Sequence, residues 1–571
     1  MRKKKVVKRI SILVSLVMAI SIMFAGTVSA GNPLELYSRD VEAKNGVVAA
    51  AKPEASQVGV DILKKGGNAV DAAVAAGFAL GVLEPNASGL GGGGFMIIRM
   101  ADTGKTVIID FRETAPKNAK ADMFKYDAEG KAVLNQENII GGKASGVPGE
   151  VAGLLTALES YGTMDRKQIM QPAIDLAEKG IPVTVNLAQI ITDEFDKINR
   201  FEATSALYLK DGLPYEVGDT IVNKDLANTL KLIQAGGKDA FYKGELAKKI
   251  ALEVQKQGGI ITVDDLKNYK VEIREPVEGT YRGYKIISTP PASSGGTHVI
   301  ELLNIMENYD LKTMGDNTTD TWHAWTEAMK LMFADRSKYM ADTGFVKVPL
   351  KGLTDKEYAK ELYKKIDMTK PAAEVEAGDP WKYESGSTTS LSIMDKYGNM
   401  VTVTKSINYF FGSGVTVPGT GIIMNNHMDD FVLKPGSVNS IEPGKRPLSS
   451  MSPTLVLDPR GRPFMTLGSP GATRIITTVA QTISNVIDHG MDIQQAILAP
   501  RIFSMQSGAV NLEGRVSIKS YEELKARGHQ VSLKGDYDAY FGGVHAVLMD
   551  YATNTLHGGA DPRRDGQAAG F

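Results

Sequence analysis

The fold is decided by residues 387–407, which read STTSLSIMDKYGNMVTVTKSI. Apolar and polar side chains alternate along residues 388–395 and again along residues 400–407, as they do in strands with one buried face. The four residues between these runs, Lys396-Tyr397-Gly398-Asn399, are typical of a hairpin turn. The stretch therefore predicts two antiparallel strands, and the hydroxyl-rich Ser387-Thr388-Thr389 lies where a polar loop becomes the first strand.

The segments on both sides of this hairpin predict sheets covered by helices. Helices are predicted over residues 54–83 (two packed helices separated by Gly66-Gly67), 319–339, 473–489 and 493–499. Strands are predicted over residues 94–111 (a second hairpin), 421–424, 454–458 and 464–467, and an exposed loop over residues 370–387. Helix-rich and strand-rich segments occur in both halves, so we expect an α/β (α+β) protein whose layers are shared along the chain.

The composition excludes several classes of protein. The 571 residues include 65 Lys and Arg against 66 Asp and Glu, and 43% are hydrophobic, which is ordinary for a globular protein. This near-neutral balance provides no overall field for nucleic acid, so no nucleic-acid partner is predicted. The chain has no cysteine, which excludes disulfides, thiol catalysis and thiolate metal sites.

The N-terminal residues 1–30 resemble a secretory signal rather than part of the fold. Basic residues within 1–9 precede an uncharged apolar run over residues 10–25, and Val28-Ser29-Ala30 supplies a small-residue cleavage site. The apolar run is shorter than the ~20 residues that span a bilayer, which argues against the alternative of an uncleaved anchor. We expect cleavage after Ala30 and a secreted protein, extracellular or in a cell-envelope space, without a stable membrane anchor.

Four clusters rich in glycine or hydroxyl residues are candidates for backbone chemistry. The loop Gly89–Gly94 follows a helix and precedes a strand, the reverse of nucleotide-binding loops, so we expect it to bring backbone close to an active site or another loop. The clusters at residues 290–296 and 446–453 are each, taken alone, more typical of structural turns. Residues 468–474 lead into a predicted helix, where backbone N–H groups can hold an oxyanion or a carboxylate.

The remaining nucleophile candidates are hydroxyl groups. No Gly-x-Ser-x-Gly elbow is present, and the seven histidines show no metal-ligand spacing, so neither a serine-hydrolase triad nor a metal site is predicted. This leaves the hydroxyl run that begins the first strand of the 387–407 hairpin.

Several long motifs in order resemble the gamma-glutamyltransferase (gamma-glutamyltranspeptidase) family, and together they cover nearly the whole chain after residue 30. They are Gly67–Ala73, Gly89–Gly94, Asp110–Pro116, Thr388–Asn399, Asn425–Phe431, Lys445–Pro453, Gly468–Gly471 and Asp561–Gly566. The resemblance implies an N-terminal nucleophile hydrolase with a four-layer αββα sandwich. It also implies a precursor that cleaves itself between Ser387 and Thr388 into associated heavy (31–387) and light (388–571) subunits.

The implied chemistry needs no cofactor. A threonine hydroxyl is a weak nucleophile without a base. Cleavage would supply that base, because the new α-amine of Thr388 has a reference pKa near 7.7–8.0. The resemblance implies that Thr388 is nucleophile and base, that Gly471 and Ala472 are oxyanion N–H donors, and that Ser406 is a hydrogen-bond partner of the nucleophile. It also implies two groups of substrate-binding residues. The α-carboxylate would be bound by Arg112, Ser449 and Ser450, and the α-ammonium by Asn408, His427 and Asp430.

Some positions depart from the family pattern. Ala472 replaces a glycine, Ser406 replaces a threonine, and Ser390 lies where histidine is frequent. His427 replaces the usual Gln or Glu, and a histidine repels a cation when protonated, so we expect weaker recognition of a free amine. Residues 432–445 are short compared with relatives that carry a lid, which indicates an open cleft. For Arg112, a surface ion pair with Glu113 or Asp110 remains the alternative to substrate binding.

The expected function is that of a γ-glutamyltransferase and glutathione hydrolase. The γ-glutamyl group of glutathione, glutamine or a γ-glutamyl polymer would pass to water or to an amino-acid or peptide amine. Three alternatives remain open: a poly-γ-glutamate depolymerase, a cephalosporin- or glutaryl-type acylase, and a secreted binding protein with an inactive site.

Overall fold

The computed structural model describes residues 39–372, 375 and 387–571, and residues 40–571 belong to one compact unit. The predicted signal segment 1–30 and most of the predicted loop 370–387 lie outside the described residues. Within the described part of the chain, no helix has both the length and the hydrophobicity needed to cross a membrane.

The predicted hairpin at residues 387–407 is confirmed. Strand β12 (Ser387–Asp395) pairs antiparallel with β13 (Met400–Asn408), and Gly398 adopts a φ of +84° in the turn, which favours glycine. The Asp395 carboxylate caps this turn and also accepts a hydrogen bond from Ala69 N at 3.0 Å. Residue 69 begins helix α4, so the turn attaches the hairpin to the first half of the chain.

The hairpin lies in the middle of a seven-stranded sheet with the order β23-β2-β12-β13-β3-β4-β9. Its other strands are β2 (Gly46–Ala50), β3 (Gly93–Arg99), β4 (Thr106–Asp110), β9 (Glu272–Arg274) and β23 (Gln567–Gly570). Strands β3 and β4 form the second predicted hairpin. Because β2 and β3 flank β12 and β13, the two halves of the chain share this sheet.

A second seven-stranded sheet has the order β1-β22-β21-β17-β16-β11-β10. It consists of β1 (Val41–Ala43), β10 (Val277–Tyr281), β11 (Tyr284–Ser288), β16 (Thr454–Leu457), β17 (Pro463–Gly468), β21 (His545–Asp550) and β22 (Thr555–Ala560). It packs against the first sheet through β12 and β13 on one side and β17 and β21 on the other. Its four central strands, β22, β21, β17 and β16, follow residue 388 in the sequence, whereas β1 on one side and β11 and β10 on the other precede it.

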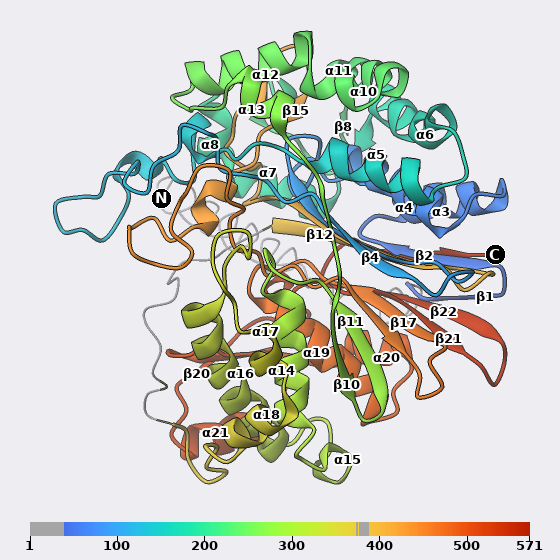
Figure 1. Ribbon diagram of the computed structural model, residues 1–571, viewed down its shortest axis with the longest axis vertical. Coiled ribbons are helices and arrows are strands. Elements are labelled where there is room, and N and C mark those ends of the chain that lie inside the picture. The colour runs from blue at the N-terminus through green and yellow to red at the C-terminus, as the bar shows by residue number, and fades with distance from the viewer. Residues whose placement is uncertain (1–38, 373–374, 376–386) are drawn as a thin grey trace, which may run out of the picture. The chain divides into compact units, whose positions relative to one another are not determined.

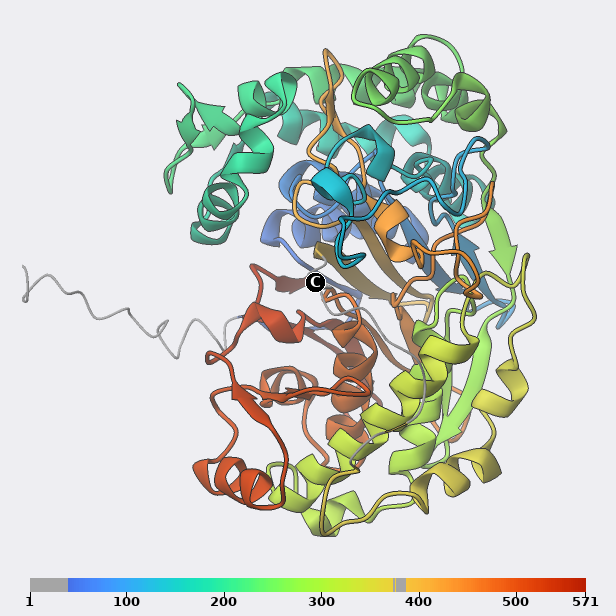
Figure 2. The same ribbon diagram turned by 90° about the vertical axis from the view of Figure 1, so that its left-hand side faces the viewer.

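Helices cover the outer face of each sheet, which gives the expected αββα layers (Figure 1). On the first sheet lie α3 (Pro53–Lys64), α4 (Ala69–Leu83), α5 (Glu150–Tyr161) and α6 (Arg166–Lys179). On the second lie α14 (Gly295–Met306), α16 (Thr319–Tyr339), α18 (Lys356–Tyr363), α19 (Arg474–Ile487) and α20 (Ile493–Leu498). Figure 2 shows the same separation of the two helix groups after a quarter turn.

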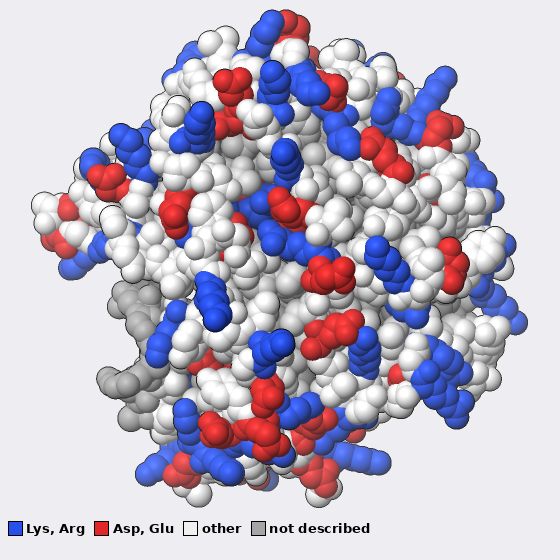
Figure 3. All heavy atoms as spheres, in the orientation of Figure 1, with Lys and Arg blue, Asp and Glu red and all other residues white. Residues whose placement is uncertain are grey.

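Two hydrophobic cores result. The first lies between the first sheet and its helices, and the second fills the space between the two sheets and extends to the helices of the second sheet. Helix α4 is apolar on every face, and all of its residues except Gly81 are buried, as expected for a helix enclosed by other elements. Many charged side chains lie on the surface, and Figure 3 shows acidic and basic residues interspersed over the visible face.

The remaining elements are short or lie at the periphery. The helices are α7 (Val185–Asp193), α8 (Phe195–Asn199), α9 (Glu202–Tyr208), α10 (Lys224–Gly236), α11 (Lys238–Tyr242), α12 (Glu245–Lys256), α13 (Val263–Asn268), α15 (Leu311–Met314), α17 (Leu350–Leu353) and α21 (Ile518–Ala526). The strands are β5 (Ile181–Pro182), β6 (Leu209–Lys210), β7 (Leu213–Pro214), β8 (Thr220–Ile221), β14 (Thr416–Val417), β15 (Ile422–Ile423), β18 (Ile502–Phe503), β19 (Val510–Leu512) and β20 (Val531–Leu533). The 3-10 turns are η1 (Leu134–Gln136), η2 (Gly142–Ala144), η3 (His427–Asp430) and η4 (Ala539–Phe541).

Candidate active site

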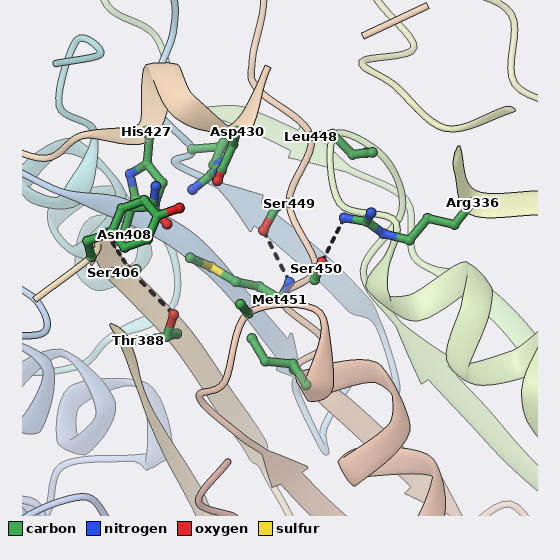
Figure 4. Close-up of a pocket in the computed structure, with 14 residues that line it drawn as sticks. Arg336, Thr388, Ser406, Asn408, His427, Asp430, Leu448, Ser449, Ser450 and Met451 are labelled. Atoms are coloured by element: carbon green, nitrogen blue, oxygen red, sulfur yellow. Dashed lines mark hydrogen bonds and ion pairs between the residues drawn. The ribbon is translucent and has the colours of Figure 1, made fainter. Parts of the chain in front are cut away.

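Thr388 lies at an irregularity in the central hairpin. The pairing of β12 with β13 shifts register between Ser387 and Thr389. Thr388 therefore lies opposite two residues of β13, Ser406 and Ile407. Its hydroxyl donates to Ser406 Oγ at 3.3 Å, and Ser406 Oγ accepts a second hydrogen bond from Asn408 N at 2.7 Å (Figure 4). The Thr388 hydroxyl is thus oriented by a second hydroxyl on the neighbouring strand.

The glycine-rich loop at residues 89–94 packs directly against β13. A Cβ atom on Gly92 would lie 2.2 Å from the carbonyl oxygen of Ser406, and one on Gly94 would lie 2.3 Å from that of Thr404. Neither contact is sterically possible, so glycine is required where the loop meets the strand. The interpretation that this loop brings backbone close to another segment is confirmed, and that segment carries Ser406.

A pocket opens in front of Thr388 and collects most of the predicted site. Its lining includes Arg112, Thr388, Ser406, Asn408, His427, Asp430, Ser449, Ser450 and Ala472, all predicted from the sequence. It also includes Arg336, Tyr409, Leu448, Met451 and Ile475, which the sequence analysis did not identify. Of the predicted residues, Gly471 lies beside the lining rather than in it, and Ser387 precedes Thr388 on β12.

The basic group of the pocket is buried, not on the surface. Arg112 is 0% exposed and follows β4. Its guanidinium forms an ion pair with Asp430, lies 3.5 Å from Glu113 Oε2 and donates to the carbonyl oxygen of Pro447 at 3.3 Å. The ion pair with Glu113 that the alternative named is therefore present, but it is buried rather than on the surface. One cation and one anion, Arg112 and Asp430, instead face each other at the pocket.

Two buried ionisable groups lie beside this pair. His427 Nδ1 is 2.8 Å from Glu113 Oε1, and both side chains are almost fully buried. Burial raises the pKa of Glu113 to about 8, although the Arg112 charge opposes this change. Burial, and secondly the charge of Arg112, lowers the pKa of His427 well below its usual range. His427 is therefore neutral near pH 7 and does not repel a cation in the pocket.

Hydroxyl groups form another wall, and a second arginine holds it in place. Arg336 on α16 donates to Ser450 Oγ at 2.8 Å (Figure 4). It also donates to Ser294 Oγ at 2.9 Å. Ser294 in turn donates to the Ser449 carbonyl oxygen at 2.7 Å. The 290–296 cluster thus supports the 446–453 cluster. No local pattern in the sequence distinguishes Arg336, because α16 also carries Lys330 and Lys338.

Backbone groups complete the pocket at the start of α19. Gly471 has a φ of +128° and Ala472 a φ of +51°, and their carbonyl groups accept hydrogen bonds from Arg474 N and Ile475 N. A left-handed conformation costs a residue other than glycine roughly 1–2 kcal/mol. This cost makes glycine the less strained residue at position 472, while alanine still provides the same N–H group.

Comparison with known proteins gives a consistent result. The family model for gamma-glutamyltranspeptidase matches residues 55–571. The glutathione hydrolase proenzyme of Escherichia coli (strain K12) is 44% identical over 546 residues, covering 93% of each chain. The glutathione hydrolase proenzyme of Bacillus subtilis (strain 168) is 42% identical over 544 residues, covering 92% of each.

A solved structure resembles the whole chain as well. The crystal structure of cephalosporin acylase from Bacillus halodurans superposes with a TM-score of 0.85 at 32% identity, covering 96% of this chain and 98% of that one. This likeness supports the N-terminal nucleophile hydrolase fold expected from the sequence. With the match over residues 55–571 and relatives above 40% identity along nearly the full length, the chain belongs to the gamma-glutamyltranspeptidase family.

Proposed function

We propose that the protein is a γ-glutamyl hydrolase and transferase that acts on glutathione and related γ-glutamyl amides. The observation that carries this proposal is the position of Thr388: its hydroxyl is oriented by Ser406 and lies in a pocket that also contains Arg112 and Asp430. The relatives named glutathione hydrolase favour this function over a polymer depolymerase or an inactive binding protein.

The nucleophile becomes active when the chain cleaves itself between Ser387 and Thr388. Residues 31–387 and 388–571 then remain together as heavy and light subunits, and the signal segment 1–30 directs export. The new α-amine of Thr388, with a reference pKa near 7.7–8.0, is partly neutral at physiological pH. It takes the proton of the Thr388 hydroxyl during attack.

The reaction then has two steps. Thr388 Oγ attacks the γ-carbonyl carbon, and the oxygen that gains negative charge is held by the N–H groups of Gly471 and Ala472. The C–N bond breaks, the leaving amine receives the proton from the α-ammonium of Thr388, and an ester remains. Water, or the amine of an amino acid or peptide, attacks this ester and restores the Thr388 hydroxyl.

The pocket suits the zwitterionic end of a γ-glutamyl group. Arg112 and Asp430 form an ion pair with each other, and the substrate's carboxylate and ammonium replace this pairing with two new ones. Ser449 and Ser450 add hydroxyl donors for the carboxylate. Asn408 and neutral His427 add hydrogen-bonding capacity near the ammonium.

Sequencing the N-terminus of the smaller fragment tests the cleavage. We expect it to begin at Thr388, and we expect Thr388→Ala to remain one piece without activity. Thr388→Ser is the matched control, because it keeps a hydroxyl and should cleave and retain part of the activity. Full activity in an uncleaved chain would contradict the mechanism.

A second experiment separates this function from that of an acylase, which the likeness to the cephalosporin acylase makes the second candidate. A γ-glutamyl anilide and a glutaryl anilide share the scissile bond and the α-carboxylate position, but only the first has an ammonium group. We expect kcat/KM to be at least tenfold higher for the γ-glutamyl anilide. A preference for the glutaryl compound would assign the chain to the acylases.

A further inference from the structure

A second group of buried polar side chains lies outside the pocket, around α16. It comprises His323, Glu327 and His529, which are 0%, 2% and 6% exposed. His323 Nδ1 lies 2.7 Å from His529 Nε2, and the candidate ligand atoms of all three residues lie within 4.8 Å of one another. Nothing in the proposed γ-glutamyl chemistry uses these side chains.

The hydrogen bonding of His323 fixes which of its nitrogens faces the other residues. His323 Nε2 lies 2.9 Å from the backbone carbonyl oxygen of Asp367, which can only accept, so Nε2 carries the proton. Nδ1 therefore presents its lone pair toward His529 and Glu327. A carbonyl that binds the remote N–H of a histidine is the usual support of a metal-ligating imidazole.

The two imidazole rings face each other closely, with their centroids 4.9 Å apart. Two neutral rings whose nitrogens face each other can share one proton, or each can direct a lone pair at a cation.

The backbone holds the three residues rigidly. His323 and Glu327 are four residues apart on α16, so they lie on one face of the helix. His529 follows Gly528, whose φ of +105° turns the chain after α21. Ligand sets on fixed elements lose little conformational freedom when they bind an ion.

One contact competes with a cation at this place. Lys330 Nζ pairs with Glu327 Oε1 at 2.7 Å, while Glu327 Oε2 accepts a hydrogen bond from Ala372 N at 2.9 Å. A bound ion must displace the lysine ammonium from the carboxylate. The guanidinium of Arg527, which also faces the cluster, pairs with Asp320.

We propose that His323, Glu327 and His529 bind one divalent transition-metal ion of the zinc class. Two imidazole nitrogens and one carboxylate oxygen are ligands that suit Zn²⁺, whereas Ca²⁺ prefers six to eight oxygens. In a tetrahedral site the two nitrogens stand about 3.3 Å apart. Their present separation of 2.7 Å must therefore widen slightly.

The ligands come from both sides of the proposed cleavage site: two precede residue 387 and one follows residue 388. If the chain is cleaved there, a claim that rests on the proposed function, the ion joins the heavy subunit to the light one. Ion binding itself does not depend on cleavage, so the two claims can fail separately.

The test uses the full-length protein after treatment with a chelator. Co²⁺ is added, and the visible absorption of tetrahedral Co²⁺ is recorded together with the metal content after dialysis. We expect one ion per chain, displacement of Co²⁺ by Zn²⁺, and a higher melting temperature with Zn²⁺. His323→Gln and His529→Gln should each weaken binding at least tenfold, whereas His489→Gln, which changes a histidine outside the cluster, should bind as the parent does.

The same titration on Thr388→Ala separates the two proposals, because that variant should bind the ion although it is neither cleaved nor active. Should His323→Gln or His529→Gln fail to fold, the affinity of Glu327→Gln for the ion is compared with that of the parent protein instead. We expect it to be at least tenfold weaker. A folded parent that retains no ion, or an unchanged affinity in folded His323→Gln and His529→Gln, would overturn the metal site.

Discussion

At the scale of single residues, His427 lines the pocket at the position that we propose for recognition of a free amine. Its Nδ1 lies 2.8 Å from Glu113 Oε1 without forming a hydrogen bond to it, and a neutral imidazole has one nitrogen that donates and one that accepts. A glutamine offers a carbonyl oxygen whose ability to accept a hydrogen bond does not depend on a tautomer. The residue type at this position therefore affects affinity for the α-ammonium rather than the chemical step.

We predict that His427→Gln improves binding of γ-glutamyl donors. One additional hydrogen bond to a charged group contributes about 1.5 kcal/mol, which corresponds to roughly a tenfold lower KM with little change in kcat. The glutaryl anilide is the internal control, because it lacks the ammonium and its KM should not change. Equal changes in KM for both anilides would show that His427 acts through pocket shape alone.

Glu113 makes the stability of the protein depend on pH. Its folded-state pKa of about 8 lies above its ordinary value of 4.5 because of burial, so folding favours the protonated acid. This contribution is complete below about pH 4.5 and is lost progressively as the pH rises to about 8. A neutral glutamine has no such dependence.

We therefore predict that Glu113→Gln gains stability relative to the parent between pH 5 and pH 8. Thermal melting of both proteins on the inactive Thr388→Ala background at several pH values measures this difference without interference from cleavage. A difference in melting temperature that stays constant across this pH range would contradict the assignment of a raised pKa to Glu113.

At the scale of elements, the contact between the 89–94 loop and β13 links a turn to the nucleophile. Because a Cβ on Gly92 would lie 2.2 Å from the Ser406 carbonyl oxygen, a larger residue must push β13 away. The Ser406 hydroxyl that orients Thr388 would move with the strand. Such a displacement of the site by about 1 Å can reduce a rate by roughly a hundredfold.

We predict that Gly92→Ala lowers the rate of self-cleavage at least tenfold. The matched control is Gly352→Ala, since a Cβ on Gly352 meets no atom within 4 Å. Cleavage is followed by the appearance of two bands on denaturing gels after synthesis. Normal cleavage in a folded Gly92→Ala protein would show that the position of β13 is not critical.

Elements with local signals were predictable from the sequence, whereas long-range contacts were not. The alternation of residues 388–407 predicted β12 and β13 to within one residue, and the predicted helix at 319–339 coincides with α16. In contrast, Arg336 meets Ser450 across 114 positions, and Ser390 contacts His545 across 155 positions. No periodicity encodes such pairs, because the first arises from the packing of α16 against the segment before β16 and the second from the stacking of the two sheets.

The residues of the candidate site were predictable from the sequence, whereas the contacts between them were not. Family motifs identified Thr388, Arg112, Asp430 and the serines, and nine of the predicted residues line one pocket. The pairing of Arg112 with Asp430, and of His427 with Glu113, could not be read from the motifs. Each depends on how η3 lies over the end of β4, which only the tertiary packing determines.

At the scale of the whole molecule, both large sheets combine strands from each side of residue 388. In the first sheet β12, β13 and β23 alternate with β2 and β3, and in the second β16 pairs with β11. Separating the pieces would break backbone ladders in both sheets and expose both hydrophobic cores.

We predict that the two pieces formed by cleavage stay associated at any practical dilution. They should elute together in size-exclusion chromatography at neutral pH and separate only in guanidinium chloride. Addition of a chelator tests the contribution of the proposed metal site, which should lower the denaturant midpoint without separating the pieces under native conditions. Dissociation on dilution alone would contradict this prediction.

The interleaved strands also bear on how such a protein can be made. A gene divided at codon 388 would yield two polypeptides, each with half-built sheets and open strand edges prone to aggregation. Translation as one polypeptide instead delivers both portions in equal number and already tethered. Assembly is then an intramolecular event. The bond between residues 387 and 388 is cleaved only after the two portions have folded together.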